Sequence, residues 1–291
     1  MKRKSDIIRN FIFENTDIRG EVVALSKTCN DILANHQYGA SVERLLSEFI
    51  CAATLLSTTI KFEGLLTLQA RGTGEIPLIM AECSSEQKVR AIARGAEQAS
   101  SNNFQTLLCN GQLAITIDPK NGKTYQGIVP LDGENLAECL ESYFVHSEQL
   151  ATRIWLAHKN GNCGGLLLQQ LPKKIDQSPE HRANQWQHIC QLAETIKPQE
   201  LIELNVEELL FRLYHQEKVR IFEPKDVEFQ CSCSWENSIA VLATLSHSEL
   251  EELLEEQGEI EVNCEFCNYN YSFGATQISA LIDGKQPTRF H

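Results

Sequence analysis

Four cysteines near the end of the chain have the residue type and spacing of a metal site. They form two close pairs, Cys231-Ser-Cys233 and Cys264-Glu-Phe-Cys267, separated by thirty residues. Each pair can supply two sulfur ligands to a metal ion. The chain between the pairs is long enough to fold back, so both pairs can bind the same ion. Four protein thiolates leave no position for water or substrate. The pattern therefore predicts a structural or switching zinc site rather than a hydrolytic one.

Other interpretations of these cysteines are chance clustering, two disulfides of a secreted domain and a thioredoxin-like motif. The other seven cysteines show no such clustering. The N-terminus is basic but lacks an apolar segment of signal-peptide length, which disfavours secretion. A thioredoxin-like pair needs a helix after its first thiol, whereas residues 268–273 alternate like a strand or turn. Zinc binding is the better prediction.

The same thiols could respond to oxidants. Cys-x-Cys is a less usual zinc-binding pair than Cys-x-x-Cys, and each pair keeps its sulfurs close enough to react once a metal leaves. A zinc-bound thiol is deprotonated, and the thiolate is the form that oxidants attack. The four residues can therefore bind zinc when reduced and form two disulfides when oxidised.

Composition limits the classes of protein to consider. The chain has 291 residues, 42% hydrophobic and 22% charged, which allows a main domain and one or two smaller ones. No apolar run reaches membrane-spanning length. The net charge of -13 and pI of about 5.1 disfavour nucleic acid as a partner. Eleven cysteines favour a reducing compartment, so we expect a cytoplasmic protein.

The other cysteines sit singly among apolar or small neighbours, and we expect them to be buried small hydrophobic residues. They are Cys29, Cys51, Cys83, Cys109, Cys139, Cys163 and Cys190.

Residues 1–178 are predicted to form an α+β domain with a mostly antiparallel sheet, because strand signals outnumber helices and are joined mainly by hairpins. Apolar residues recur with helical spacing from Val42 to about Thr58. The other predicted elements are helices at about 25–35 and 135–148, and strands at 18–24, 66–71, 76–81, 113–118, 125–131, 152–158 and 165–171.

Residues 179–230 are predicted to be a mainly helical linker, entered through a polar hinge at residues 173–179. One helix ends before Pro198, and Asn205 with Glu208 caps a second. A short strand is expected at residues 218–222. Narrow apolar stripes on the two helices require docking on a neighbouring surface, and undocking would expose that surface.

Residues 231–291 are predicted to form a small zinc-binding domain. We expect a helix face made by Ile239, Leu242 and Leu245, and a second helix at 248–257 with a Ser248–Glu251 capping box, ending at Gly258. This segment has ten acidic residues but only two basic ones, the opposite of a zinc ribbon that reads nucleic acid. So small a module should depend on its metal.

The motif closely resembles the zinc signature of the bacterial redox-regulated 33-kDa heat-shock chaperones. The resemblance covers residues 229–236 and 264–273 and extends along nearly the whole chain. It includes, in order, residues 66–74, 82–83, 125–129, 164–172 and 222–224.

The resemblance implies an ATP-independent holdase rather than an enzyme, with unfolded or oxidatively damaged proteins as clients. It implies one zinc per chain on Cys231, Cys233, Cys264 and Cys267 in an inactive, reduced monomer. Oxidation would form the disulfides Cys231–Cys233 and Cys264–Cys267, expel zinc and destabilise the linker. The active form would be a homodimer, with client binding and dimerisation assigned to residues 1–178.

Two residues depart from the family pattern. Asn237 stands where a basic residue is common, and Trp235 where a polar or basic one is frequent. Neither residue is a metal ligand. The two departures therefore concern how the zinc module docks on the rest of the protein and how readily it undocks.

Competing functions make different predictions. A thiol-disulfide oxidoreductase using Cys264 and Cys267 would show catalytic turnover. A zinc-ribbon adaptor would bind nucleic acid in a salt-dependent way, which the acidic balance opposes. A hydrolytic metal site is disfavoured because the histidines form no metal-spaced pair.

Overall fold

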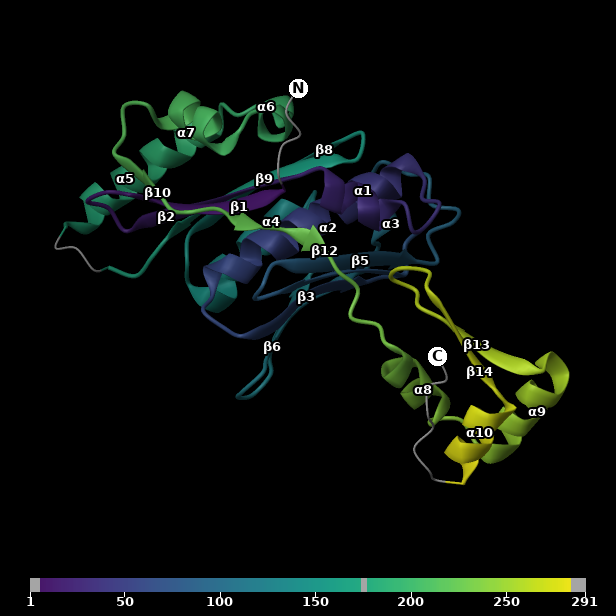
Figure 1. Cartoon of the computed structure of the whole chain (residues 1–291). Coiled ribbons are helices and arrows are strands. Elements are labelled where there is room, and N and C mark those ends of the chain that lie inside the picture. Colours follow the sequence, from purple (N-terminus) through teal and green to yellow (C-terminus); the bar gives the residue numbers. More distant parts are fainter. Residues whose placement is uncertain (1–5, 174–176, 284–291) are drawn as a thin grey trace. The chain divides into compact units, whose positions relative to one another are not determined.

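The computed structural model describes residues 6–173 and 177–283, in which the chain divides into two compact units, 1–230 and 231–291 (Figure 1). Residues 174–176 of the predicted hinge lie outside the described residues. No described helix is both long enough and apolar enough to cross a bilayer.

The first unit contains two six-stranded sheets. The first has the order β10-β1-β2-β9-β8, with β11 paired to β1, and the second has the order β12-β5-β4-β3-β6-β7. Every pairing is antiparallel except that of β12 with β5. The strands of the first sheet are β1 (Ile7–Phe13), β2 (Ile18–Leu25), β8 (Thr152–Lys159), β9 (Asn162–Gln170), β10 (Val219–Ile221) and β11 (Lys225–Asp226). Those of the second are β3 (Gly64–Arg71), β4 (Leu78–Ser84), β5 (Lys88–Arg94), β6 (Gln112–Pro119), β7 (Tyr125–Pro130) and β12 (Glu228–Phe229).

These pairings confirm the α+β class. The predicted strands 66–71 and 76–81, 113–118 and 125–131, and 152–158 and 165–171 do pair as antiparallel hairpins. The pairings also divide the hairpins between two sheets, β8–β9 in the first and β3–β4 and β6–β7 in the second. The predicted elements omit strands β1 and β5. In β1, Ile8 joins one core cluster while Phe11 and Phe13 join another, so the strand has no polar face.

The helix α2 (Ala40–Thr59) lies between the two sheets and packs on strands of both (Figure 1). The predicted apolar face is buried, and so are Ser47, Thr54 and Ser57 on other sides of the helix. The hydroxyls of Ser47 and Thr54 donate to backbone carbonyls one turn earlier, which satisfies them inside the core. The other helices here are α1 (Lys27–Leu33), α3 (Phe104–Leu107) and α4 (Leu136–Tyr143), the last continuing as a π-helix, η1 (Phe144–Glu148).

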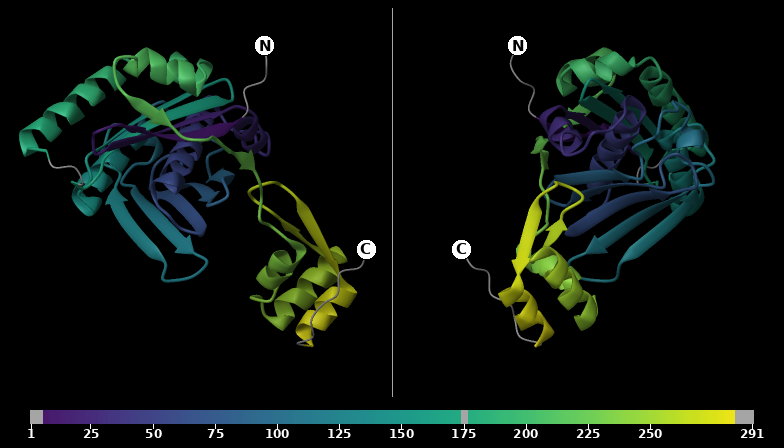
Figure 2. Two further views of the ribbon diagram at one scale, coloured as in Figure 1. Left: turned by 60° about the vertical axis from the view of Figure 1, so that its left-hand side comes forward. Right: turned by 90° about the vertical axis from the view of Figure 1, so that its right-hand side faces the viewer.

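Three helices cover the other face of the first sheet (Figures 1 and 2): α5 (Pro179–Ala193), α6 (Pro198–Glu203) and α7 (Val206–Tyr214). The predicted cap of α7 is present, with Asn205 accepting from the amide of Glu208 at 2.8 Å. The buried cluster beneath these helices, called here the linker core, joins sheet residues to helix residues. It comprises Phe11, Phe13, Ile18, Val22, Ala157, Leu166, Leu168, Ile189, Cys190, Ala193, Leu201, Val206, Leu209, Leu210, Leu213 and Tyr214.

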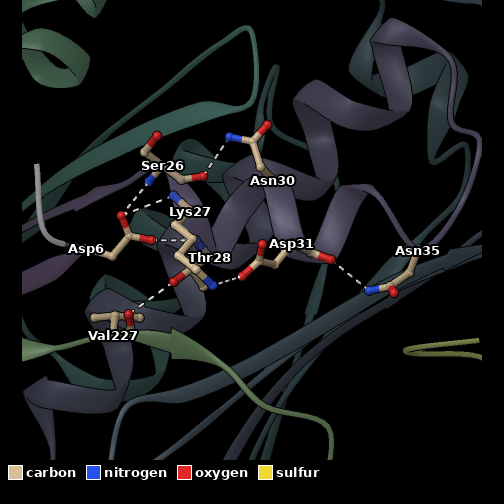
Figure 3. Close-up of polar contacts among 8 residues, drawn as sticks. All are labelled: Asp6, Ser26, Lys27, Thr28, Asn30, Asp31, Asn35 and Val227. Atoms are coloured by element: carbon tan, nitrogen blue, oxygen red, sulfur yellow. Dashed lines mark hydrogen bonds and ion pairs between the residues drawn. The ribbon is translucent and has the colours of Figure 1, made fainter. Parts of the chain in front are cut away.

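Asp6, just before β1, caps α1 from outside the helix (Figure 3). Its carboxylate accepts hydrogen bonds from the amides of Ser26, Lys27 and Thr28, which a helix start leaves unpaired. The hydroxyl of Thr28 then donates to the carbonyl of Val227 at 3.1 Å. The helix start is thereby tied to both ends of the first unit.

The chain just before the first zinc-type cysteine is anchored in the first unit. Val227 is 4% exposed, and its amide donates to the carbonyl of Asp6 at 2.9 Å. Strand β12 pairs in parallel with β5, and the amide of Gln230 donates to the carbonyl of Val89 at 3.1 Å. This anchoring reaches the residue that precedes Cys231.

The second unit contains α8 (Trp235–Leu242), α9 (His247–Gln257), the hairpin β13 (Glu259–Asn263) and β14 (Asn270–Gly274), and α10 (Ala275–Ile282). Its core is small and consists of Ile239, Leu242, Leu250, Ile260, Tyr271, Phe273 and Ile278.

The predicted Ser248–Glu251 capping box in this unit is wrong. The cap is Ser246, whose amide donates to the Glu249 carboxylate at 2.8 Å while its hydroxyl accepts from the Glu249 amide at 3.3 Å. The earlier start places Leu245 before the cap and Leu250 in the first turn, where both join the core as a hydrophobic staple. The predicted stop at Gly258 is confirmed, with φ of 78°.

The seven other cysteines largely match the prediction. Cys109 is half-buried, and the other six are buried. Burial raises the pKa of Cys83 and of Cys190 to about 12, so these thiols stay protonated and unreactive.

A carboxyl group is buried in the first sheet without enough polar partners to offset the cost of burying its charge. Glu21 on β2 is 1% exposed, and its Oε1 lies 3.7 Å from Nε of Arg19. Neither Oε2 of Glu21 nor Nε of Arg19 has a hydrogen-bond partner among the described residues. Burial raises the pKa of Glu21 from 4.5 to about 7, and the charge of Arg19 offsets only part of that effect.

We expect Glu21→Gln to stabilise the protein at pH 8 and to have little effect at pH 5. The raised pKa favours the protonated acid in the folded state, so stability falls as pH rises from about 4.5 to about 7. The free energy involved is on the order of 3 kcal/mol. Urea unfolding of the reduced protein at both pH values measures it, and an equal effect at the two values would contradict the assignment.

Candidate metal centre

The structure brings the four cysteines of the two pairs together. Their sulfur atoms all lie within 4.8 Å of one another, and all four residues are partly buried. The Sγ atoms of Cys231 and Cys264 are 3.6 Å apart, and those of Cys233 and Cys267 are 3.5 Å apart. These separations far exceed the length of a disulfide bond, so none of the four sulfurs is in a disulfide.

Local backbone structure positions each pair. Cys264 and Cys267 lie in the turn between β13 and β14, where the Asn268 amide donates to the Cys264 carbonyl at 2.7 Å. Asn268 has φ of 54°, a left-handed conformation that asparagine tolerates better than most residues. The Cys264 amide donates to the carbonyl of Tyr269 at 2.9 Å, which closes the turn.

The first pair precedes α8. Ser234 caps that helix by accepting from the amide of Asn237 at 3.1 Å. The side-chain amide of Asn237 donates to the carbonyl of Ser232, which lies between the two cysteines, at 3.3 Å. Asn237 thus helps to hold the Cys231-Ser-Cys233 loop. No sequence pattern gave it this role.

The cluster fits a tetrahedral zinc ion. Zinc–sulfur bonds of about 2.3 Å at tetrahedral angles would place sulfurs about 3.8 Å apart. The Cys233–Cys267 and Cys231–Cys264 separations, 3.5 and 3.6 Å, are close to that value. The donor set is four thiols without histidine or carboxylate, which suits zinc better than harder cations.

The sulfurs differ in their surroundings. Burial raises the pKa of Cys231 and that of Cys267. Burial acts on Cys233 in the same direction, but hydrogen bonds from the Tyr271 hydroxyl and from neighbouring thiols outweigh it and lower the pKa of Cys233. The Tyr271 hydroxyl donates to Sγ of Cys233 at 3.3 Å. Tyr271 lies within the cysteine motif of the sequence, but only the folded hairpin brings its hydroxyl to the sulfur of Cys233.

The arrangement does not suit thioredoxin-like chemistry. Cys264 and Cys267 lie in a hairpin turn, and the next element is strand β14 rather than a helix. A helix N-terminus is the usual means of lowering the pKa of such a thiol.

The comparisons with known proteins name the Hsp33 family or 33 kDa chaperonins. The Hsp33 protein family model matches residues 6–274. A 33 kDa chaperonin of Pseudomonas aeruginosa strain PAO1 is 48% identical over 283 residues, covering 96% of this chain and 95% of that protein. One from Azotobacter vinelandii is 49% identical over 282 residues, with the same coverage.

A solved structure has the same fold. The crystal structure of the 33 kDa chaperonin, a heat shock protein 33 homolog, from Thermotoga maritima matches with a TM-score of 0.83. It is 20% identical to this chain, and the match covers 97% of this chain and 99% of that one.

We expect Cys264→Ser to abolish stable zinc binding and unfold the second unit. Structural zinc contributes on the order of 10 kcal/mol to small folds, and the small core here would not compensate for its loss. Zinc content of the reduced protein and limited proteolysis within residues 231–283 would measure the effect.

Cys109→Ser is the matched control, because it removes one half-buried thiol from the other unit. Full zinc content and an intact second unit in Cys264→Ser would show that the cluster is not a metal site.

Proposed function

The chain belongs to the Hsp33 family of heat-shock chaperones, and we propose that it is an ATP-independent holdase switched on by oxidation. In the proposed inactive state, the reduced monomer binds one zinc ion on Cys231, Cys233, Cys264 and Cys267. Its clients are unfolding or oxidatively damaged proteins, and it works in the reducing cytosol as a binder rather than an enzyme.

The observation that carries this proposal is the gathering of four sulfurs within 4.8 Å in a small separate unit. Zinc, when bound, would hold the sulfurs as thiolates and join the two pairs. The core of the unit is small, so loss of that link would unfold it.

The proposed oxidation needs only peroxide and the cysteines. Peroxide transfers an oxygen atom to one sulfur, giving a sulfenic acid and one water. The neighbouring thiol then displaces the oxygen as a second water, which forms the disulfide. We assign the pairs Cys231–Cys233 and Cys264–Cys267, because one or two intervening residues keep those sulfurs close after the unit unfolds. Pairing across thirty residues would require closing a much longer loop.

The linker helices provide a surface that the switch could expose. Undocking of α5, α6 and α7 would uncover the apolar side of the linker core on the first sheet. An exposed patch of aromatic and aliphatic side chains binds unfolded chains without sequence preference. We also propose that the oxidised form dimerises through residues 1–178.

Docking of these helices depends on charge as well as apolar contact. Arg182 pairs with Asp17, a carboxylate only 3% exposed, and its guanidinium donates to the carbonyl of Leu171 at 3.0 Å. Arg9 on β1 pairs with Glu207 on α7. Undocking must therefore break a largely buried ion pair. The same ion pair favours one position of the helices on the sheet over others.

The direct test measures zinc and chaperone activity together. Reduced protein should contain one zinc per chain and should not suppress aggregation of a heat-unfolded client. After peroxide treatment at elevated temperature, zinc should be released as suppression appears, and suppression should be stoichiometric with client rather than catalytic. Zinc retention with activity, or equal activity of the reduced form, would contradict the switch. Catalytic thiol-disulfide turnover would favour an oxidoreductase.

We expect Leu209→Ala to lower the temperature at which oxidised protein becomes active. Leu209 is fully buried in the linker core, and such a truncation costs about 2–5 kcal/mol. Phe211→Ala is the matched control, because Phe211 lies on the same helix but is 73% exposed. Chaperone activity measured against temperature gives the shift. Equal shifts in the two variants would show that docking of α7 does not set the temperature of activation.

A further inference from the structure

Tyr271 places a hydroxyl against one of the four sulfurs. Its Oη donates to Sγ of Cys233 at 3.3 Å, although the two residues are 38 positions apart. Burial raises the pKa of Cys231 and that of Cys267, and the backbone amides of Cys233 and of Tyr269 act against that rise. Those two donors are peptide groups of the loops themselves. Tyr271 contributes a side chain, which a substitution can remove without altering the backbone.

The hairpin fixes the position of this hydroxyl. Tyr271 pairs with Val262 across β13 and β14, and it points to the same side as Phe273, two residues on. Phe273 is fully buried and packs on Trp235, with ring centroids 5.4 Å apart. Tyr271 itself is 9% exposed. Its ring is therefore held between the core and the cysteines.

We propose that Tyr271 is a positioning residue that shields Cys233 from oxidants and thereby sets the oxidant threshold of the switch. The inference rests on the proposed function. In the zinc-loaded protein the thiol would already be deprotonated, so a further donor does not change how much thiolate is present. An O–H donor on that thiolate occupies one lone pair and draws electron density from it, which makes the sulfur a weaker nucleophile toward the oxidant. In the step concerned, peroxide transfers one oxygen atom to sulfur and leaves as water, so the hydrogen bond must weaken or break.

The shield acts on the pair that precedes α8. Cys231 and Cys233 come directly after Gln230, whose amide is bonded to Val89 in the first unit. Slow oxidation of Cys233 would therefore delay the disulfide adjoining the anchored chain.

The test compares Tyr271→Phe with wild type in the zinc-loaded, reduced full-length protein. Phenylalanine keeps the ring and removes only the donor. With peroxide at fixed temperature, zinc release should be faster by about threefold to tenfold. Differential alkylation and mass spectrometry should show that oxidation of Cys233 accelerates more than that of Cys264.

Tyr269→Phe is the matched control. Tyr269 is a neighbouring tyrosine whose ring lies 4.7 Å from that of Tyr271, but its side chain is 55% exposed. It should release zinc at the wild-type rate. Equal rates in all three proteins, or equal acceleration in both variants, would overturn the proposal.

A spectroscopic measurement separates the hydrogen bond from a packing role. In protein loaded with excess cobalt(II), loss of a donor to sulfur should move the sulfur-to-metal charge-transfer band to longer wavelength. We expect this shift in Tyr271→Phe and not in Tyr269→Phe. An unchanged band in Tyr271→Phe would overturn the proposal even if that variant bound zinc poorly.

These results stand apart from the proposed function. If zinc release is unchanged in Tyr271→Phe but oxidised protein still protects clients, only the role of Tyr271 fails. If zinc release accelerates but no protein protects clients, the shield is real and the chaperone switch fails.

Discussion

The second unit depends on four sulfur atoms that converge from two distant loops. Its core is a small set of side chains contributed by three short helices and a hairpin. A fold of this size buries little apolar surface, and a metal link between the loops would supply the missing stability. The same link consists of oxidisable groups. In the proposed switch, stability and sensitivity to oxidants would therefore reside in the same atoms.

The first unit would supply the complementary part of the proposed switch. The inner faces of its two sheets enclose α2 and form one core, whereas the outer face of the first sheet is covered, within the described part of the chain, by α5, α6 and α7. Helices α6 and α7 are short, and α5, although 15 residues long, presents a mainly polar surface with few buried residues. Their docking depends on the linker core and on a few ion pairs, so it is the less costly part of the first unit to open.

The stretch that leads into the zinc-type cysteines belongs to the core of the first unit. Val227 is buried, Asp6 and Thr28 bond to it, and β12 extends the second sheet by two residues. The chain from the linker helices to Cys231 is therefore held in place by hydrogen bonds to the first unit. A change at the first cysteine pair acts on a segment that is hydrogen-bonded to both sheets.

The sequence by itself determined the features that depend on local spacing. Paired cysteines, helical periodicity in α2, hairpin signals and the cap at Asn205 each involve residues near one another, so the pattern shows the structure directly. Tertiary structure alone decided the division into two sheets, the remote cap supplied by Asp6, the burial of Glu21 and the contact of Tyr271 with Cys233. Each of these joins residues far apart in the chain or depends on which face of a strand is covered. Even the cap of α9 had two local solutions, and packing of Leu245 and Leu250 selected one.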